Sequence, residues 1–166
     1  MTDVTLTDNE PVDVAPAEPA RFFIDTNWYE GQGRSFRAMA QGRFCPACTA
    51  KVGSTVEDRV PVVEKKSNRV VFETRDVAYG DQPMAVIRGC CSKQRNYITP
   101  DTPLLEAVFR VFLATGNQPA TIERIREQLG DWISPRDRPH NYAEELIATL
   151  LMHDRGYGLR EFALVT

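Results

Sequence analysis

The chain has 166 residues, a formal net charge of −3 and a hydrophobic content of 42%, which is enough for one compact domain or two small ones. No apolar run approaches the roughly 20 residues that cross a bilayer, and the start lacks the basic-then-apolar pattern of a secretory signal. The sequence therefore predicts a cytoplasmic protein with no membrane partner, in which cysteines stay reduced.

Charge is distributed unevenly along the chain. Residues 1–20 hold five acids and no base, residues 21–99 hold 13 Lys/Arg against 8 acids, and residues 100–166 hold 7 Arg against 10 acids. We predict a disordered acidic tail over 1–20, a basic module over 21–99 and a helical unit over 100–166. An anionic partner, either nucleic acid or an acidic protein surface, is expected on the basic module.

The basic module begins with an apolar segment, followed by Asp25 as a candidate helix cap. Gly31 and Gly33 disfavour a helix before residue 34, so we predict the first helix over about 34–42. Three arginines lie off its apolar stripe: Arg34, Arg37 and Arg43. They form either a phosphate-binding edge or an ordinary solvated face.

All four cysteines lie in two places, Cys45 with Cys48 and Cys90 with Cys91. A Cys-x-x-Cys pair with a Gly a few residues later is typical of a zinc knuckle, and a second thiol pair would complete a tetrahedral structural Zn²⁺ site. Adjacent cysteines reach one ion only if the backbone turns between them, and Gly89 would permit that turn.

Three alternatives remain for the cysteines. If only one of Cys90 and Cys91 binds the metal, His140 or His153 would supply the fourth ligand. The four thiols could instead be buried without metal, because free cysteine is among the most buried residue types. Two disulfides in a secreted protein are the third alternative.

A β-hairpin is predicted between the two cysteine pairs, from runs 59–64 and 69–74 joined by a turn at 65–68. Pro61 places the first strand at an edge, and residues 84–88 are expected to form a third strand. Residues 44–95 thereby resemble a zinc ribbon with an enlarged insertion. After Cys91, a polar stretch would form an exposed lip that meets nucleic acid or serves solubility alone; its candidate binding residues are Lys93, Arg95 and Tyr97.

The helical unit opens with Thr102 as N-cap and Pro103 as first helical residue, followed by an amphipathic helix over 104–113. A second helix is expected over 122–129. A third would follow a capping box of Asn141 and Glu144, and residues 159–165 would form a strand.

Three helices and a closing strand resemble a winged helix with a reduced wing, which makes the whole chain α+β. Acids on the third helix would repel phosphates: Glu144, Glu145 and Asp154. We therefore expect this unit to hold a protein partner rather than to read DNA.

No catalytic motif stands out, and four thiolates leave a metal no open position for water. We expect a non-enzymatic zinc-binding adaptor or accessory subunit of a transcription, translation or nucleic-acid-processing assembly. The alternatives are a stand-alone winged-helix DNA-binding regulator and an iron or thiol redox protein. A redox Cys-x-x-Cys would need a strand before it and a helix starting at its first cysteine.

Overall fold

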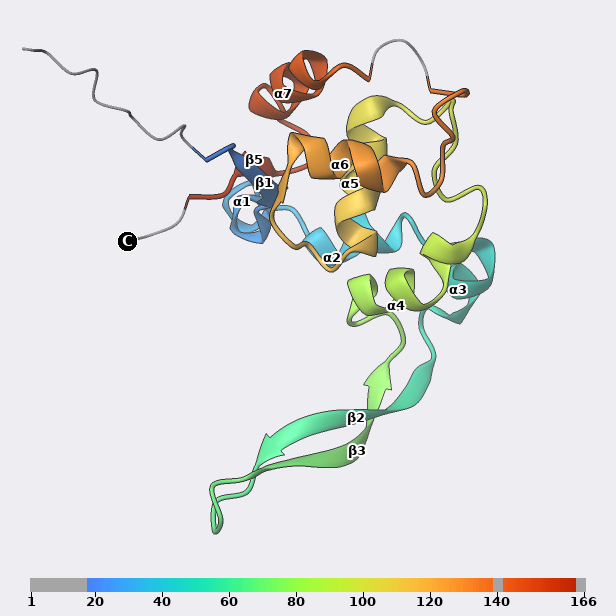
Figure 1. Cartoon of the computed structure of the whole chain (residues 1–166). Coiled ribbons are helices and arrows are strands. Elements are labelled where there is room, and N and C mark those ends of the chain that lie inside the picture. The colour runs from blue at the N-terminus through green and yellow to red at the C-terminus, as the bar shows by residue number, and fades with distance from the viewer. Residues whose placement is uncertain (1–17, 139–141, 164–166) are drawn as a thin grey trace, which may run out of the picture.

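The computed structural model describes residues 18–138 and 142–163 and shows an α+β protein (Figure 1). In these ranges, seven α-helices and one short 3-10 helix accompany two small antiparallel sheets. A helical body holds the three-stranded sheet, and a two-stranded hairpin extends away from that body (Figure 1). Most of the predicted acidic tail, residues 1–17, lies outside the described residues.

The three-stranded sheet joins the beginning of the chain to its end. Strand β1 (Arg21–Ile24) lies in the middle, between β4 (Ala120–Thr121) and β5 (Leu159–Glu161). The strand predicted over 159–165 is confirmed at its start, and its last residues lie outside the described ranges. The sheet thus takes one strand from before residue 99 and two from after it.

The core of the body is formed by α5 (Leu104–Ala114), α6 (Ile122–Leu129) and α7 (Glu144–Met152), as the apolar periodicity predicts. Val108, Phe109 and Phe112 on α5 are fully buried. Two predicted caps differ from the structure. Pro103 is the N-cap of α5, and the Thr102 hydroxyl instead accepts the N–H of Thr99. At α7 the N-cap is Ala143, and Asn141 lies outside the described residues.

Two short helices follow β1. The helix predicted over 34–42 is confirmed as α2 (Phe36–Gln41), with the Ser35 hydroxyl capping it. The glycines at 31 and 33 do not prevent a helix before residue 34, contrary to expectation. Helix α1 (Thr26–Gly31) begins after Asp25, whose carboxylate accepts the N–H of Asn27, so the predicted cap at Asp25 is confirmed. Gly31 is tolerated because it is the last residue of α1.

The predicted hairpin is confirmed, with longer strands than expected. Strand β2 (Thr55–Val63) pairs antiparallel with β3 (Val70–Ala78), from Thr55 opposite Ala78 to Val63 opposite Val70. We call residues 54–79 the arm.

The prediction of a third zinc-ribbon strand over residues 84–88 is wrong. Residues 83–89 form helix α4 (Pro83–Gly89), with Pro83 in the first turn, where its missing N–H costs nothing. Pro83 and Ile87 are buried on one side of this helix, which is the four-residue spacing of a helix rather than the alternation of a strand. In the described ranges no helix is long and apolar enough to cross a membrane.

Candidate metal centre

Helix α3 (Pro46–Lys51) positions the first thiol pair. Cys45 is the N-cap of this helix, and Pro46 stands at its first position. Cys48 lies three residues after Cys45, so the two side chains share one helix face. Gly53 then adopts a φ of +98°, which favours glycine and turns the chain into the arm.

The second thiol pair lies where α4 meets the 3-10 helix η1 (Cys91–Lys93). Cys90 joins the two helices with a φ of −138° and a ψ of −66°, so the backbone turns between the adjacent cysteines as a shared site requires. The turn does not depend on Gly89 as predicted, because Gly89 is the last residue of α4 and has no positive φ.

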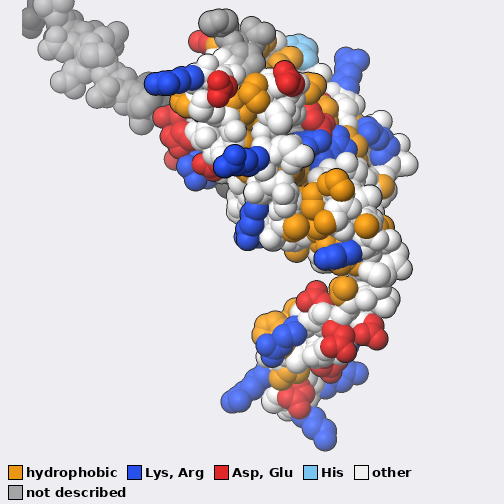
Figure 2. Space-filling view, turned by 90° about the vertical axis from the view of Figure 1, so that its right-hand side faces the viewer, with side chains coloured by type: hydrophobic (Ala, Val, Ile, Leu, Met, Phe, Trp, Pro, Cys, Tyr) orange, Lys and Arg blue, Asp and Glu red, His pale blue; other side chains and the backbone are white. Residues whose placement is uncertain are grey.

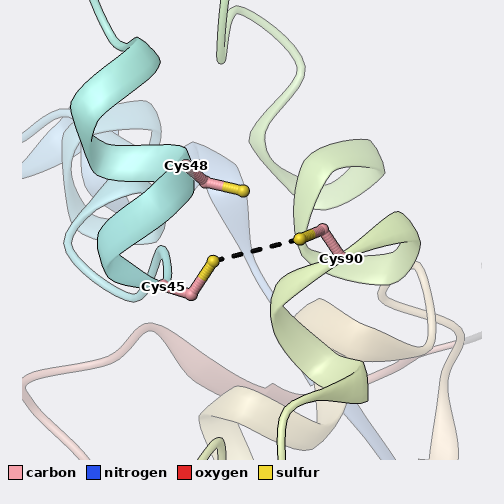
Figure 3. A group of neighbouring side chains, drawn as sticks. All are labelled: Cys45, Cys48 and Cys90. Carbon is pink, nitrogen blue, oxygen red and sulfur yellow. Dashed lines mark hydrogen bonds between the residues drawn. The ribbon is translucent and has the colours of Figure 1, made fainter.

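These two segments bring their sulfur atoms together (Figure 3). The Sγ atoms of Cys45, Cys48 and Cys90 all lie within 4.8 Å of one another, and Cys45 Sγ is 3.9 Å from Cys90 Sγ. Sulfurs about 2.3 Å from one zinc ion in a tetrahedron are about 3.8 Å apart, so this separation fits a shared metal ion. Three clustered cysteines are therefore able to hold a metal ion.

Cys91 adjoins this cluster. Its Sγ accepts a hydrogen bond from the backbone N–H of Cys45 at 3.2 Å, and its side chain is buried. The other three sulfurs meet as one group, whereas this fourth sulfur is placed against the backbone that carries Cys45. That all four cysteines are ligands stays a prediction.

The thiols perturb one another. The backbone N–H of Cys48 stabilises the Cys45 thiolate and lowers the pKa of Cys45 to about 7, whereas burial raises the pKa of Cys91 to about 12. An interaction with the Cys48 side chain raises the pKa of Tyr79, at the base of the arm, to about 12. A metal ion would bind the thiolates and release their protons.

The alternatives for the cysteines fare differently. All four cysteines are free, so the structure contains no disulfide between them. His153 is exposed, with Nδ1 2.8 Å from the Thr149 carbonyl oxygen, and no histidine of the described residues joins the cluster. His140 lies outside the described residues.

The predicted binding residues differ in their exposure and in their partners. Arg34 and Arg37 are exposed, although Arg37 pairs with Asp81 at 3.1 Å. Lys93 and Arg95 are exposed beside Trp132, and neither forms an ion pair with another described residue.

The expectation that Tyr97 lies on an exposed lip is wrong. Its side chain is only 3% exposed, and its hydroxyl donates to the Arg110 carbonyl oxygen. Arg43 is also engaged, because its guanidinium donates two hydrogen bonds to Glu106, at 2.9 and 2.8 Å. Of the six predicted binding residues, Tyr97 is thus buried, and Arg43, with its side chain 15% exposed, is occupied by Glu106.

Glu106 is the polar residue that the sequence alone did not single out. Its carboxylate accepts hydrogen bonds from Arg43 and Arg110 and is 13% exposed. Burial by itself would raise its pKa, but the two arginines outweigh burial and lower the pKa to about 2. Since Arg43 precedes Cys45 by two residues, this ion pair ties the approach to the first thiol pair to helix α5.

Asp154 also differs from expectation. It does not lie on an exposed helix face but is buried, with its carboxylate accepting the N–H groups of Gly156, Tyr157 and Leu159. It holds the turn between α7 and β5. The exposed acids of α7 are therefore Glu144 and Glu145.

Comparisons with protein-family models, with curated protein sequences and with solved structures found no match to this chain. The thiol cluster and the surfaces around it therefore carry what can be inferred about function.

Proposed function

We propose that this protein is a non-catalytic zinc-binding adaptor, or accessory subunit, of a nucleic-acid-associated assembly. The observation that carries the proposal is the meeting of Cys45, Cys48 and Cys90 within 4.8 Å, with the sulfur of Cys91 adjoining. Four sulfur ligands in a tetrahedron favour Zn²⁺, and a site closed by four ligands is structural because no position is left for water or substrate.

The position of the cluster supports a structural role. Its ligands come from α3 and from the junction of α4 with η1, which lie on either side of the arm in the sequence. Short helices such as these are marginal alone, because nucleation is costly. An ion shared between them would hold the base of the arm against the body.

The helical unit supports a protein-docking role. Its elements follow in the order α5, β4, α6, α7, β5, and we propose that they form a winged-helix-like unit whose sheet β1 completes. On α7, Glu144 and Glu145 are exposed and Met152 is 71% exposed. An acidic start and an exposed methionine at the other end of the same helix suit a basic, partly apolar protein surface better than phosphates. This favours the adaptor over a stand-alone DNA-binding regulator.

Lys93 and Arg95 support the nucleic-acid part of the proposal. They follow the second thiol pair directly, and they are exposed without ion-pair partners among the described residues. Their charge is thus available to phosphates near the metal.

One observation favours thiol redox chemistry as a second candidate. Cys45 is the N-cap of helix α3, close to the arrangement that a redox Cys-x-x-Cys needs, and a helix N-terminus stabilises a thiolate. Helix α2 rather than a strand precedes it, and two further thiols adjoin the pair, which suits a metal better than a two-cysteine redox centre.

Elemental analysis of the untagged chain, combined with a thiol titration, tests the metal. We expect one zinc per chain, and four thiols that become reactive only after chelation. A coloured protein that contains iron, or a metal-free protein that cycles between dithiol and disulfide, would replace the zinc adaptor with the redox candidate.

Fluorescence anisotropy with labelled RNA and duplex DNA at two salt concentrations tests the partner. We expect Lys93→Ala/Arg95→Ala to weaken binding and to reduce the salt dependence by about two counterions. The matched control is Arg136→Ala/Arg155→Ala, which removes two exposed arginines elsewhere. Equal loss in both variants, or no binding by the unmodified chain, would contradict this surface.

A further inference from the structure

The arm carries exposed apolar side chains that the helical body does not cover. It extends away from the helical body (Figure 1). Eight large hydrophobic side chains are exposed among the described residues, and five of them lie on the arm: Val56, Val63, Val70, Val71 and Phe72. Two-stranded hairpins are at best marginally stable alone in water. The arm therefore has the properties of a surface that a binding partner covers.

The backbone edge of β3 is the one suited to pairing. Strand β2 contains Pro61, which lacks one backbone donor. Strand β3 contains no proline and no glycine and keeps all of its N–H groups. An exposed strand of this kind is a template for another strand.

The sequence of β3 is complementary to itself in the antiparallel direction. With a two-fold axis at Thr74, Val71 lies opposite the partner's Val77, and Glu73 lies opposite the partner's Arg75. The symmetry repeats both pairs. Opposite charges and β-branched side chains are the cross-strand pairs that stabilise antiparallel sheets. In the single chain, Arg75 instead contacts Glu73 of its own strand at 3.0 Å, with both side chains exposed.

Charge along the arm favours the same direction. The far end carries three bases and one acid: Lys65, Lys66, Arg69 and Glu64. The end near the body carries three acids and one base: Glu57, Asp58, Asp76 and Arg75, which lies opposite Asp58. Figure 2 shows lysine and arginine side chains gathered toward the far end of the arm. An antiparallel arrangement places the basic end of one arm beside the acidic end of the other, whereas a parallel one would align like charges.

We propose that two copies of this chain associate through their arms, with β3 paired antiparallel to the partner's β3 about a two-fold axis at Thr74. The pairing forms a four-stranded sheet that covers the β3 edge of both arms. A second copy fits this surface better than nucleic acid does, because the acids near the body would repel phosphates. The proposal does not depend on which metal, if any, the thiols hold.

Sedimentation equilibrium of the full chain tests the proposal. We expect the unmodified protein to reach twice its mass of 18.7 kDa at micromolar concentrations. Glu73→Arg alone and Arg75→Glu alone each place like charges opposite one another at two symmetric positions. Each variant should weaken the dimer by about tenfold or more.

Mixing the two variants separates this register from any other. In the mixed pair, an arginine at position 73 faces a glutamate at position 75, and position 75 of the first chain faces the native Glu73 of the second. We therefore expect the mixture to dimerise as the unmodified chain does. The matched control is Glu127→Arg, which reverses one member of the exposed Arg124–Glu127 pair on α6 and should leave the dimer unchanged.

Three results would overturn the proposal. The unmodified chain could remain monomeric, whether or not its arm binds nucleic acid or another protein. The single reversals could leave the dimer intact, which would place the interface elsewhere. The mixture could fail to dimerise although both variants retain the far-ultraviolet circular dichroism of the unmodified chain.

Discussion

Replacing Glu106 with Gln tests how the body is held together beside the cluster. The change keeps the shape of the side chain but leaves the positive charges of Arg43 and Arg110 without their carboxylate. The pKa of Glu106 is lowered from its ordinary value of 4.5 to about 2, which corresponds to about 3 kcal/mol of stabilisation at pH 7. Because the side chain is only 13% exposed, solvent screening removes little of this amount. Loss of one partner of a buried ion pair commonly costs about 3–5 kcal/mol.

The sign of the pH dependence follows from the direction of the shift. A carboxylate with a lowered pKa in the folded state stabilises the protein above pH 4.5, and this stabilisation is lost as the pH falls toward 2. Urea unfolding followed by tryptophan fluorescence should show Glu106→Gln about 3 kcal/mol less stable than the unmodified chain at pH 7. The gap should narrow to about 1 kcal/mol at pH 3.

Glu127→Gln is the matched control. Glu127 pairs with Arg124 at 3.0 Å, but both side chains are more than half exposed, so its loss should cost no more than about 0.5 kcal/mol. If Glu106→Gln costs no more than this control at pH 7, or if the gap does not change at pH 3, the buried ion pair does not stabilise the body as described.

Three further changes address other parts of the fold. Cys48→Ser should abolish metal binding and lower the melting temperature by roughly 10 °C, because metal affinity is folding energy in such sites; an unchanged melting profile would contradict a structural metal. Gly158→Ala should cost about 2–3 kcal/mol, since φ is +70° and the new Cβ would lie 2.8 Å from Tyr29 Cε2; Gly31→Ala, with open space around it, is the control that should not destabilise. Asp154→Asn removes one acceptor oxygen from a buried turn and should cost about 1–2 kcal/mol in chemical unfolding, a loss that Glu145→Gln on the surface should not reproduce.

Elements with long, regular patterns could be predicted from the sequence. Helices α5 and α6 were placed within a residue or two, because each combines an apolar stripe with a start signal and a glycine after its end or close to it. The hairpin was also identifiable, since valine-rich strands flank a polar turn.

Short elements could not be predicted in the same way. The run Met84–Arg88 is too short for periodicity to separate a helix from a strand, and Pro83 at the helix start was the signal that decides it. Strand β4 has only two residues, and it exists because β1 pairs with it. Tertiary contacts, not local preference, determine such elements.

For the candidate site, too, the sequence predicts some features and tertiary contacts determine others. The spacing of Cys45 and Cys48 and the second pair at Cys90 indicated a thiol cluster, and three of the four sulfurs meet as a group. The ion pair of Arg43 could not be predicted from the sequence, because its partner Glu106 is 63 residues away. A basic residue in a sequence carries no sign of whether a distant acid will neutralise it.

The arm leaves the body and returns to it at a single point, where the N–H of Tyr79 donates to the Ser54 carbonyl oxygen at 2.8 Å. Residues added or removed in pairs across β2 and β3 would therefore move neither Cys48 nor Cys90. Each added pair would lengthen the ribbon by about 3.3 Å. The length of the arm can thus change, in evolution or by engineering, while the cysteine cluster at its base keeps its geometry.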